Sequence, residues 1–318
     1  MMTPFKSVTA FAPATVANAG CGYDIMGFAI NGIGDKVTVS LQTDAEPSQV
    51  VLSGPYGHLI PSVRKKNTAS VAVDAYLEVT GNMHLNFRIE LEKNLPLGSG
   101  MGSSSASSAA AVFAVNYLLG SPLTTEELIP FAMEGERIAC GSAHADNVAP
   151  SLLGGFVLIR SYNPLDIIPV TCPDDLYCTV VHPQIELHTS DARRILKMEI
   201  TMGNAIRQSA NTAGFMLALL NKDYALLSRS MQDLLAEPKR AQLIPGFDAI
   251  KKTALATGAF GCGISGSGPS IFALCKGEES AKMVSKTIQE GFLNVGLASE
   301  SFVSSLKAKG CVIVDSIK

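Results

Sequence analysis

Glycines and serines are concentrated near the middle of the chain, in the segment Pro96-Leu97-Gly98-Ser99-Gly100-Met101-Gly102-Ser103-Ser104-Ser105-Ala106. The three glycines allow the main chain to approach a ligand closely. An Ala-rich, helix-like run follows directly, and the first turn of a helix offers unpaired N–H groups and the positive end of the helix dipole. This combination is suited to hold an anion. Residues 96–106, called the phosphate loop below, are therefore predicted to bind phosphate.

Regular segments flank the phosphate loop on both sides. Upstream, Leu85, Phe87, Ile89 and Leu91 alternate with polar residues, which is the period of a half-buried strand. Downstream, the Ala-rich run stops at 120–122, where Gly-Ser-Pro is typical of a helix end. A strand–loop–helix unit is the predicted context of the loop.

Glycine-rich segments also occur in other kinds of structure and site. Gly/Ser/Ala clusters also occur in flexible linkers and in tight helix packing. No Gly-Lys-Ser/Thr follows the glycines, which excludes a phosphate loop of the Walker type. A Gly-x-Gly-x-x-Gly does occur at Gly261, Gly263 and Gly266. A helix-like segment precedes it and a strand-like one follows, however, which is the reverse of a dinucleotide-binding unit.

The overall composition indicates a globular protein with a small partner. Of 318 residues, 47% are hydrophobic and 17% charged, and the formal net charge is −3. This length favours two domains. The weak charge favours neither nucleic acid nor an anionic membrane as a partner. No apolar stretch approaches the roughly 18 residues that span a bilayer.

The N-terminus and the cysteines predict a cytoplasmic protein. Residues 8–19 imitate a signal peptide only faintly, because Pro13 and several polar residues interrupt them. The seven cysteines form an odd set without Cys-x-x-Cys or a zinc-like pairing with histidine. Such a set is typical of reduced thiols in small core positions. Cys21 and Cys262 lie beside glycine-rich segments and are candidates to line a site.

Turn residues divide the chain near 161–175, where Asn163-Pro164 and Pro173-Asp174-Asp175 bracket a short stretch. We expect an N-terminal domain over 1–165 and a C-terminal α+β domain over 166–318. Strands are predicted near 5–11, 36–42, 48–53, 85–92, 154–160, 176–182 and 270–275, with two more at the C-terminus. Helices are predicted near 67–80, 103–119, 125–139, 190–196, 202–220, 222–236, 246–257 and 278–291. Thr124 and Glu127 form a capping-box pattern for the third helix, and Pro130 predicts a kink or a later start.

Three segments, in order along the chain, resemble the motifs of the GHMP kinase superfamily. They are residues 12–24, which begin Ala-Pro-Ala-Thr-Val-Ala-Asn and end Gly-Tyr-Asp, the phosphate loop, and residues 263–270, Gly-Ile-Ser-Gly-Ser-Gly-Pro-Ser. The intermediate segments resemble the homoserine kinase family within that superfamily. They are residues 141–150, Gly-Ser-Ala-His-Ala-Asp-Asn-Val-Ala-Pro, then Thr189-x3-Arg193, and residues 240–246, Arg-x2-Leu-Ile-Pro-Gly. By motif, the resemblance extends over nearly the whole chain.

The resemblance implies an α+β fold of two domains. The N-terminal domain would be like domain 2 of ribosomal protein S5, the C-terminal domain would be ferredoxin-like, and the site would lie between them. The implied reaction is ATP-dependent phosphorylation of the hydroxyl of L-homoserine, in threonine biosynthesis, with Mg²⁺ and in a homodimer. The chain departs from the family pattern at Met101, where Leu is common, at Ser105, which replaces Ala, and at Lys197, where Pro is usual.

The nucleotide and metal sites follow from this resemblance. The phosphate loop would hold the phosphates through main-chain amides, and Asn67 would contact the adenine. A hydroxyl of Ser104 or Ser103 would join Glu136 on Mg²⁺, a hard ion that prefers oxygen ligands. Taken alone, Asn67 is explained equally well as a helix N-cap, and Glu136 as a solvated surface residue.

The homoserine site needs cationic and anionic groups a fixed distance apart. Arg193 and Arg240 would take the carboxylate and Asp24 the ammonium, because charge-assisted pairs are the strong ones. The other expected substrate contacts are Asn18, His144, Asn147, Thr189 and Gly266. Asn147, Arg193 and Glu136 are the expected catalytic residues. Taken alone, Arg193 beside Arg194 is also explained as an exposed helical charge, and Asn18 as a turn residue.

A dedicated general base is not expected. His144 and Asp146 are the titratable neighbours of Asn147. A loose phosphoryl-transfer transition state needs little activation of the nucleophile, and the family's hydroxyl is thought to lose its proton to the γ-phosphate. Asp146 is then a local hydrogen-bond acceptor.

Two other functions stay open at this stage. One is a kinase for mevalonate or another small alcohol, in which Asp24 opposite two arginines would be poorly used. The other is a catalytically silent member that senses a metabolite, against which the intact Ser104, Glu136 and glycines argue.

Overall fold

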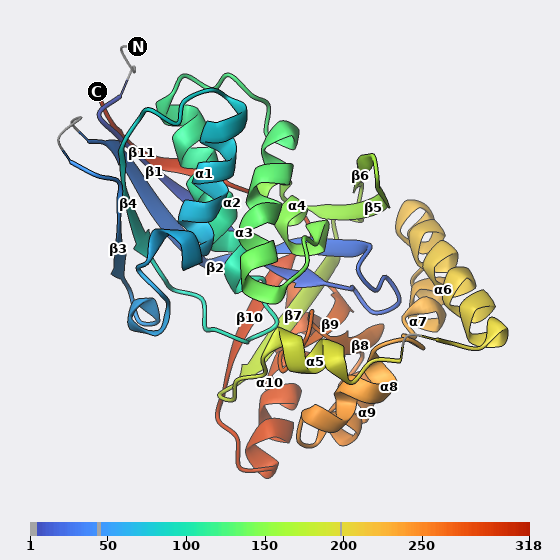
Figure 1. Ribbon diagram of the computed structural model, residues 1–318. Coiled ribbons are helices and arrows are strands. Elements are labelled where there is room, and N and C mark those ends of the chain that lie inside the picture. The colour runs from blue at the N-terminus through green and yellow to red at the C-terminus, as the bar shows by residue number, and fades with distance from the viewer. Residues whose placement is uncertain (1–4, 43–45, 198) are drawn as a thin grey trace.

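The computed structural model describes residues 5–42, 46–197 and 199–318, whose strands form two sheets (Figure 1). The first sheet has seven strands, in the order β11-β1-β2-β4-β3, with β5 paired to β2 and β6 to β5. Its strands are β1 (Ser7–Ala17), β2 (Met26–Leu41), β3 (Gln49–Ser53), β4 (Phe87–Glu92), β5 (Phe156–Tyr162), β6 (Leu165–Val170) and β11 (Val312–Ile317). Strand β3 runs parallel to β4, and the other pairs are antiparallel.

The long strand β2 begins ten residues earlier than the sequence predicted, at Met26 instead of residue 36. Its first part is apolar and buried, so it lacks the alternation that reveals a half-buried strand. Gly27 also weakened the strand signal of β2 in the sequence, because glycine is unfavourable inside a strand. A Cβ at Gly27 would lie 1.8 Å from the carbonyl oxygen of Asp146, so glycine is needed where β2 meets the next layer.

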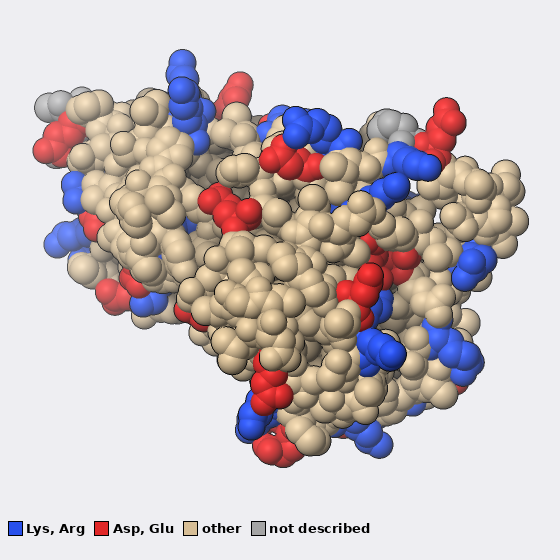
Figure 2. Space-filling view, turned by 90° about the horizontal axis from the view of Figure 1, so that it is seen from below, with Lys and Arg blue, Asp and Glu red and all other residues tan. Residues whose placement is uncertain are grey.

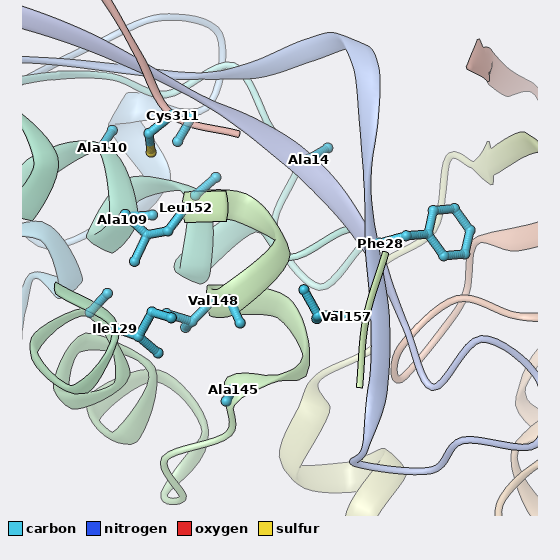
Figure 3. Packing of buried hydrophobic residues seen from close by; sticks show 14 of the residues in the cluster. Ala14, Phe28, Ala109, Ala110, Ile129, Ala145, Val148, Leu152, Val157 and Cys311 are labelled. Atoms are coloured by element: carbon cyan, nitrogen blue, oxygen red, sulfur yellow. The ribbon is translucent and has the colours of Figure 1, made fainter. Parts of the chain in front are cut away.

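Four helices cover one face of the first sheet (Figure 1): α1 (Thr68–Val79), α2 (Ser103–Leu118), α3 (Ile129–Cys140) and α4 (Ala145–Leu153). Helix α2 is buried almost all round, because its Ala and Ser side chains are small enough for close packing on the sheet. Figure 3 shows Val148 and Leu152 of α4 pointing toward Ile129 and Ala109 of the neighbouring helices. This packing fixes the helix that carries Asp146 and Asn147.

The second sheet is antiparallel, in the order β10-β7-β9-β8. Its strands are β7 (Leu176–Pro183), β8 (Gly261–Ile264), β9 (Ile271–Lys276) and β10 (Ser299–Ser305). Helices α9 (Phe247–Ala256) and α10 (Glu278–Asn294) pack on it, and Ile250, Ile288 and Phe292 belong to its core. The remaining helices are α5 (Thr189–Arg194), α6 (Met202–Asn221), α7 (Tyr224–Ser230) and α8 (Glu237–Arg240), with 3₁₀ turns at Gly57–Leu59, Arg64–Lys66, Glu126–Leu128 and Ala241–Leu243.

The predicted α+β fold is confirmed, with four missed elements and one overlong helix. Helix α4, strand β6, strand β8 and helix α8 were not predicted. Helix α4 lies inside a motif, β6 between turn signals and β8 in a glycine-rich segment, and α8 has only four residues. The helix expected over 222–236 ends at Ser230. Helix α3 starts at Ile129 with Pro130 in its first turn, which is the later start that Pro130 predicted.

The two sheets do not correspond to the N-terminal and C-terminal halves of the chain. Strand β11 at the C-terminus pairs with β1 at the N-terminus, so both ends of the chain meet in the first sheet (Figure 1). The expected domain boundary at 165/166 falls within β6, which belongs to the first sheet. The division into 1–165 and 166–318 stays a prediction.

The face shown in Figure 2 is mixed in charge. Figure 2 shows acidic and basic side chains interspersed over a broad uncharged surface on the face that it presents. None of the helices in the described ranges is long and apolar enough to cross a bilayer. All seven cysteines are free thiols.

Candidate active site

The main cavity, of about 450 Å³, brings together the three motif segments and the segments between them. Its wall includes most of the phosphate loop, parts of α3, α4 and α5, and the residues Ala17, Asn18, Asp24, Gly266 and Ser267. Cavities of this size suit small organic ligands. The predicted site residues that line it are Asn18, Asp24, Asn67, Leu97, Gly98, Ser99, Gly100, Gly102, Ser103, Ser104, Glu136, His144, Asn147, Thr189, Arg193, Arg240 and Gly266.

Four residues of the phosphate loop lie behind the cavity wall instead of in it: Pro96, Met101, Ser105 and Ala106. Met101 is fully buried, and its carbonyl accepts a hydrogen bond from the N–H of Thr15 at 3.1 Å. Cys21 and Cys262, expected near a site, are buried and line none of this cavity, whereas Cys140 does. Small apolar thiols fill core space, which explains the two buried positions.

The phosphate loop has a main-chain shape that glycine makes possible. Gly98, Gly100 and Gly102 all have positive φ, at 56°, 75° and 68°. Gly102 precedes α2 and provides no side-chain cap, so the N–H groups of the first turn stay available at the cavity. A Cβ at Gly102 would lie 2.1 Å from Thr15 Oγ1, and one at Gly100 would lie 2.3 Å from the carbonyl oxygen of Ser265. No larger residue fits at either position.

The third motif supports the phosphate loop from outside the cavity. Ser265 Oγ donates to the carbonyl of Gly100 at 2.7 Å, and Ser270 Oγ donates to that of Ser99 at 2.6 Å. His182 Nδ1 lies 3.1 Å from Ser270 Oγ, and burial lowers the pKa of His182 to about 4. The imidazole is therefore neutral and serves as a fixed hydrogen-bonding support.

A buried ion pair lies under the start of α2, and the sequence analysis missed it. The Lys93 ammonium pairs with Asp35, donates to Ser107 Oγ at 2.9 Å and donates to the carbonyl of Ser103 at 2.5 Å. Asp35 Oδ1 also accepts from the N–H groups of Asn94 and Leu95. Because Lys93 and Asp35 are 58 residues apart, no local pattern joins them. The pair fixes the first turn of α2 against the sheet.

Glu136 is buried against the phosphate loop and is not a solvated surface residue. Its Oε2 accepts from Ser104 Oγ at 2.6 Å and from Ser105 Oγ at 2.8 Å. The Cys140 thiol lies 3.3 Å from Oε1. The hydroxyl of Ser105, a departure from the family pattern, therefore has a partner. Serine and carboxylate oxygens meet at one wall of the cavity, which is a donor set for a hard cation.

Metal ligands supplied by this chain alone would be few. The described residues contain no group of three or more His, Cys, Asp and Glu side chains arranged to hold an ion. A cation beside Glu136 would need further oxygens from a ligand, as Mg²⁺ commonly takes from phosphates.

Opposite charges meet at the other side of the cavity, where Asp24 pairs with Arg193. Arg193 Nη2 lies 3.0 Å from Asp24 Oδ1, and Nη1 lies 3.4 Å from Oδ2. Burial acts to lower the pKa of Arg193, but Asp24, Tyr23 and Cys140 together outweigh it, so the pKa is raised. His144 Nδ1 lies 3.7 Å from Asp24 Oδ2, and burial lowers the pKa of His144. Arg193 thus lines the cavity, paired with Asp24, and is not an exposed helical charge.

The carbonyl of Gly266 joins the first and third motifs. It accepts from Asn18 Nδ2 at 2.8 Å and from Arg240 Nη1 at 2.9 Å. Arg240 is 3% exposed and lies over the Tyr23 ring, 5.3 Å from its centroid. Burial lowers the pKa of Arg240. Asn18 and Arg240 therefore shape the cavity through main-chain contacts.

Asn147 and Thr189 hold positions at the cavity wall through hydroxyl partners. Thr15 Oγ1 donates to Asn147 Oδ1 at 2.7 Å, which leaves the Nδ2 donors for a ligand. Thr189 Oγ1 lies 3.4 Å from Ser267 Oγ. Thr15 and Ser267 are contacts that the sequence analysis did not single out.

Asn67 acts as a helix cap at the far end of the cavity. Its Oδ1 accepts from the N–H groups of Ala69 and Ser70, and its Nδ2 donates to the carbonyl of Pro61 at 2.9 Å. An apolar wall lies beside it, which the sequence did not reveal: Leu59, Ile60, Pro61, Ile138 and Ala139. A flat, mostly apolar ring would suit this end of the cavity.

The chain is similar in sequence and fold to known proteins. Residues 67–155 match the GHMP kinases N terminal domain, and residues 215–293 match the GHMP kinases C terminal domain. The chain is 50% identical to a homoserine kinase of Chloroherpeton thalassium, over 97% of this chain and 100% of that protein. It is 40% identical to one of Arabidopsis thaliana, over 98% and 86%. The crystal structure of homoserine kinase from Cytophaga hutchinsonii matches it with a TM-score of 0.94 and 46% identity, over 99% of both chains.

Proposed function

The chain belongs to the homoserine kinases of the GHMP kinase family, and from this premise we propose that it transfers the γ-phosphoryl group of ATP to the hydroxyl of L-homoserine. The product is O-phospho-L-homoserine, on the route to threonine. One observation carries the proposal: the glycine-rich helix start and the Asp24–Arg193 pair line the same cavity. An anion cradle and a zwitterion site side by side suit phosphoryl transfer to an amino alcohol.

ATP would lie along the wall formed by the phosphate loop. Main-chain N–H groups from Gly98 to Ser104 would hold its phosphates at the start of α2. The adenine would lie at the apolar end of the cavity beside Asn67. Since Asn67 caps α1 through Oδ1, the contact left to its side chain is the second N–H of Nδ2.

Mg²⁺ fits the oxygens at the Glu136 wall. Glu136 and Ser104 would hold it, and the nucleotide's phosphates would complete its coordination. When bound, Mg²⁺ neutralises phosphate charge. The hydroxyl of Ser105 orients the same carboxylate.

Homoserine would replace one ion pair by two. Its carboxylate would take Arg193, and its ammonium would take Asp24, so the charges that now satisfy each other would each keep an opposite partner. Arg240 supplies further positive potential from within the wall, and His144 borders the same carboxylate. The Nδ2 donors of Asn147 would orient the hydroxyl toward the γ-phosphate.

Asp146 is not required as a general base in this proposal. Burial, reinforced by the charges of Asp24 and Glu136, raises the pKa of Asp146 to about 8. Asp146 is then mostly protonated at pH 7, and in this proposal the hydroxyl proton passes to the transferred phosphate, because a loose transition state needs little activation of the nucleophile.

Asp146→Asn is therefore expected to keep kcat within about tenfold of the wild type at pH 7, since the amide resembles the neutral acid. The folded-state pKa lies above the ordinary value of 3.8, so protonation stabilises the fold fully below pH 3.8 and less as the pH rises toward 8. The variant lacks this dependence, so its melting temperature relative to wild type should rise between pH 5 and pH 8. A fall in kcat of several orders of magnitude, with KM and folding intact, would instead identify Asp146 as the base.

The choice of alcohol decides the proposed function. A mevalonate kinase of L. major has the same fold, with a TM-score of 0.71 at 17% identity, which shows the fold alone. Coupled ADP release with Mg²⁺ and ATP should be rapid with L-homoserine and negligible with mevalonate, because mevalonate has no ammonium for Asp24. Preference for mevalonate would end the homoserine assignment. No turnover, with binding retained in calorimetry, would favour a metabolite sensor.

We also propose a homodimer in the cytoplasm. Helix α6 carries one charged residue, Arg207, in twenty residues, and it exposes an apolar face of Met202, Ile206, Leu217 and Leu220. In an antiparallel contact with a second copy, large residues near each end would face each other, and Ala210 and Ala213 would meet at the crossing. Light scattering that gave a single chain of 33.4 kDa would contradict the dimer, and fractionation of cells would test the compartment.

A further inference from the structure

We propose that Tyr162, which lies outside the cavity, is a positioning residue for the amino-acid half of the site. Its hydroxyl joins the segment that carries Asp24 to the segment that carries His144 and Asn147. The inference rests on the proposed function, because it assigns these two segments to homoserine. Tyr162 is not part of the cavity wall, so its effect must pass through the residues that it contacts.

The contacts of Tyr162 are hydrogen bonds to two main-chain groups. Its hydroxyl donates to the carbonyl of Asp24 at 2.7 Å and accepts from the N–H of Ala145 at 3.2 Å. Ala145 is the first residue of α4, and the residue before it, His144, gives the helix no side-chain cap. Tyr162 therefore satisfies a donor that would otherwise lack a partner at the helix start. Burial raises the pKa of Tyr162, which keeps its hydroxyl protonated and able to donate.

Strand β5, which carries Tyr162, is hydrogen-bonded to the chain directly after Asp24. Leu158 pairs with Met26 in the sheet, and the N–H of Ile159 donates to the carbonyl of Ile25 at 2.7 Å. The residue after Asp24 is thus bound to the same strand as Tyr162. The Tyr162 ring also meets the His144 ring edge to face, with centroids 6.2 Å apart.

Asp24 needs this support because its main chain is in the left-handed region. Its φ is 59°, which is uncommon for a residue other than glycine. Asn18 Oδ1 accepts from the N–H of Asp24 at 3.0 Å, and Tyr162 holds the carbonyl on the other side. Loss of the Tyr162 hydroxyl would release one of these two restraints. The carboxylate would then lose part of its alignment with Arg193, and therefore with an ammonium.

The phosphate loop has no direct part in these contacts. It is held by the N–H of Thr15 and the hydroxyls of Ser265 and Ser270, and none of these residues is a hydrogen-bond partner of Tyr162. A purely structural role for Tyr162 would lower the apparent kcat through loss of folded protein and leave both KM values unchanged. A positioning role would affect homoserine alone.

The test compares Tyr162→Phe with the wild-type full chain in steady-state kinetics. The KM for homoserine should rise about threefold to tenfold, while the KM for ATP changes by less than about twofold, as expected when one hydrogen bond acts on one substrate. Hydrogen exchange should accelerate over residues 18–25 and 144–147 and stay unchanged in the phosphate loop. Tyr224→Phe is the matched control, because it removes a hydroxyl that donates to Asp175 away from the cavity. It should leave both KM values unchanged.

The outcomes separate this inference from the proposed function. Wild-type protein that does not phosphorylate homoserine would overturn the function, whatever Tyr162 does. Active wild type with an unchanged KM for homoserine in Tyr162→Phe would overturn the inference alone. A lower apparent kcat and a lower melting temperature, with both KM values unchanged, would show that Tyr162 serves only stability, and an equal rise in both KM values would also overturn the inference. If Tyr162→Phe folds poorly, exchange in the wild type decides: fast exchange at the Ala145 N–H would contradict the bond.

Discussion

Gly102→Ala is expected to lower kcat/KM for ATP by about a thousandfold. A displacement of the reacting groups by about 1 Å and the loss of aligned N–H donors to the phosphates each lower the rate roughly a hundredfold or more. The new Cβ would lie 2.1 Å from Thr15 Oγ1 and 3.0 Å from Asn147 Oδ1. Thr15 donates to Asn147, so the clash reaches the residue proposed to orient the hydroxyl. The φ of 68° adds strain for any residue with a side chain. Steady-state kinetics with varied ATP measure the effect on the phosphate loop, and kinetics with varied homoserine measure the effect that reaches Asn147.

Gly120→Ala is the control for this prediction. Gly120 follows the other end of the same helix, has a φ of 89° and would place its Cβ in open space. Alanine there should cost about 1 kcal/mol of folding stability through its main chain and leave both KM values unchanged. If Gly102→Ala retained more than a tenth of the activity with an unchanged melting temperature, the contact at Thr15 would not control the phosphate loop.

The elements that were predictable from the sequence are those with local signals. Helix α2 was expected over 103–119 and spans Ser103–Leu118, because glycines precede it and Gly-Ser-Pro ends it. Pro130 marked the start of α3 for a similar reason. The phosphate loop was recognisable because the constraint on it is the main chain's own conformation.

The parts that were not predictable depend on contacts between distant residues. Lys93 and Asp35 are 58 residues apart, and Tyr162 and Asp24 are 138 residues apart, so neither pair leaves a pattern in a short window. Gly27 weakened the strand signal of β2, although it is required by the approach of Asp146. Tertiary packing overrode propensity at these positions.

Glu136 shows the limit of local interpretation most clearly. Beside Glu134 and Arg137 it has the composition of a solvated helix face, and Glu134 does pair with Arg137 at the surface. Glu136 is only 8% exposed, because the start of α2 presents two serine hydroxyls to that side of α3. Two glutamates two residues apart thus have different environments, and only the packed structure distinguishes them.

Glu136→Gln is expected to lower kcat by about a hundredfold to a thousandfold, the usual cost of removing one preorganised charge from a reaction centre. The amide keeps the size of the side chain and an oxygen that accepts from Ser104 and Ser105, so the fold should persist. It lacks the negative charge that Mg²⁺ requires of its carboxylate ligand, so the Mg²⁺ concentration for half-maximal rate should rise, and calorimetry should show weaker binding of Mg·ATP. Glu134→Gln, on the same helix but 41% exposed and paired with Arg137, is the matched control and should change neither quantity. Equal effects of the two substitutions would mean that the charge of α3, and not a ligand at Glu136, influences the nucleotide.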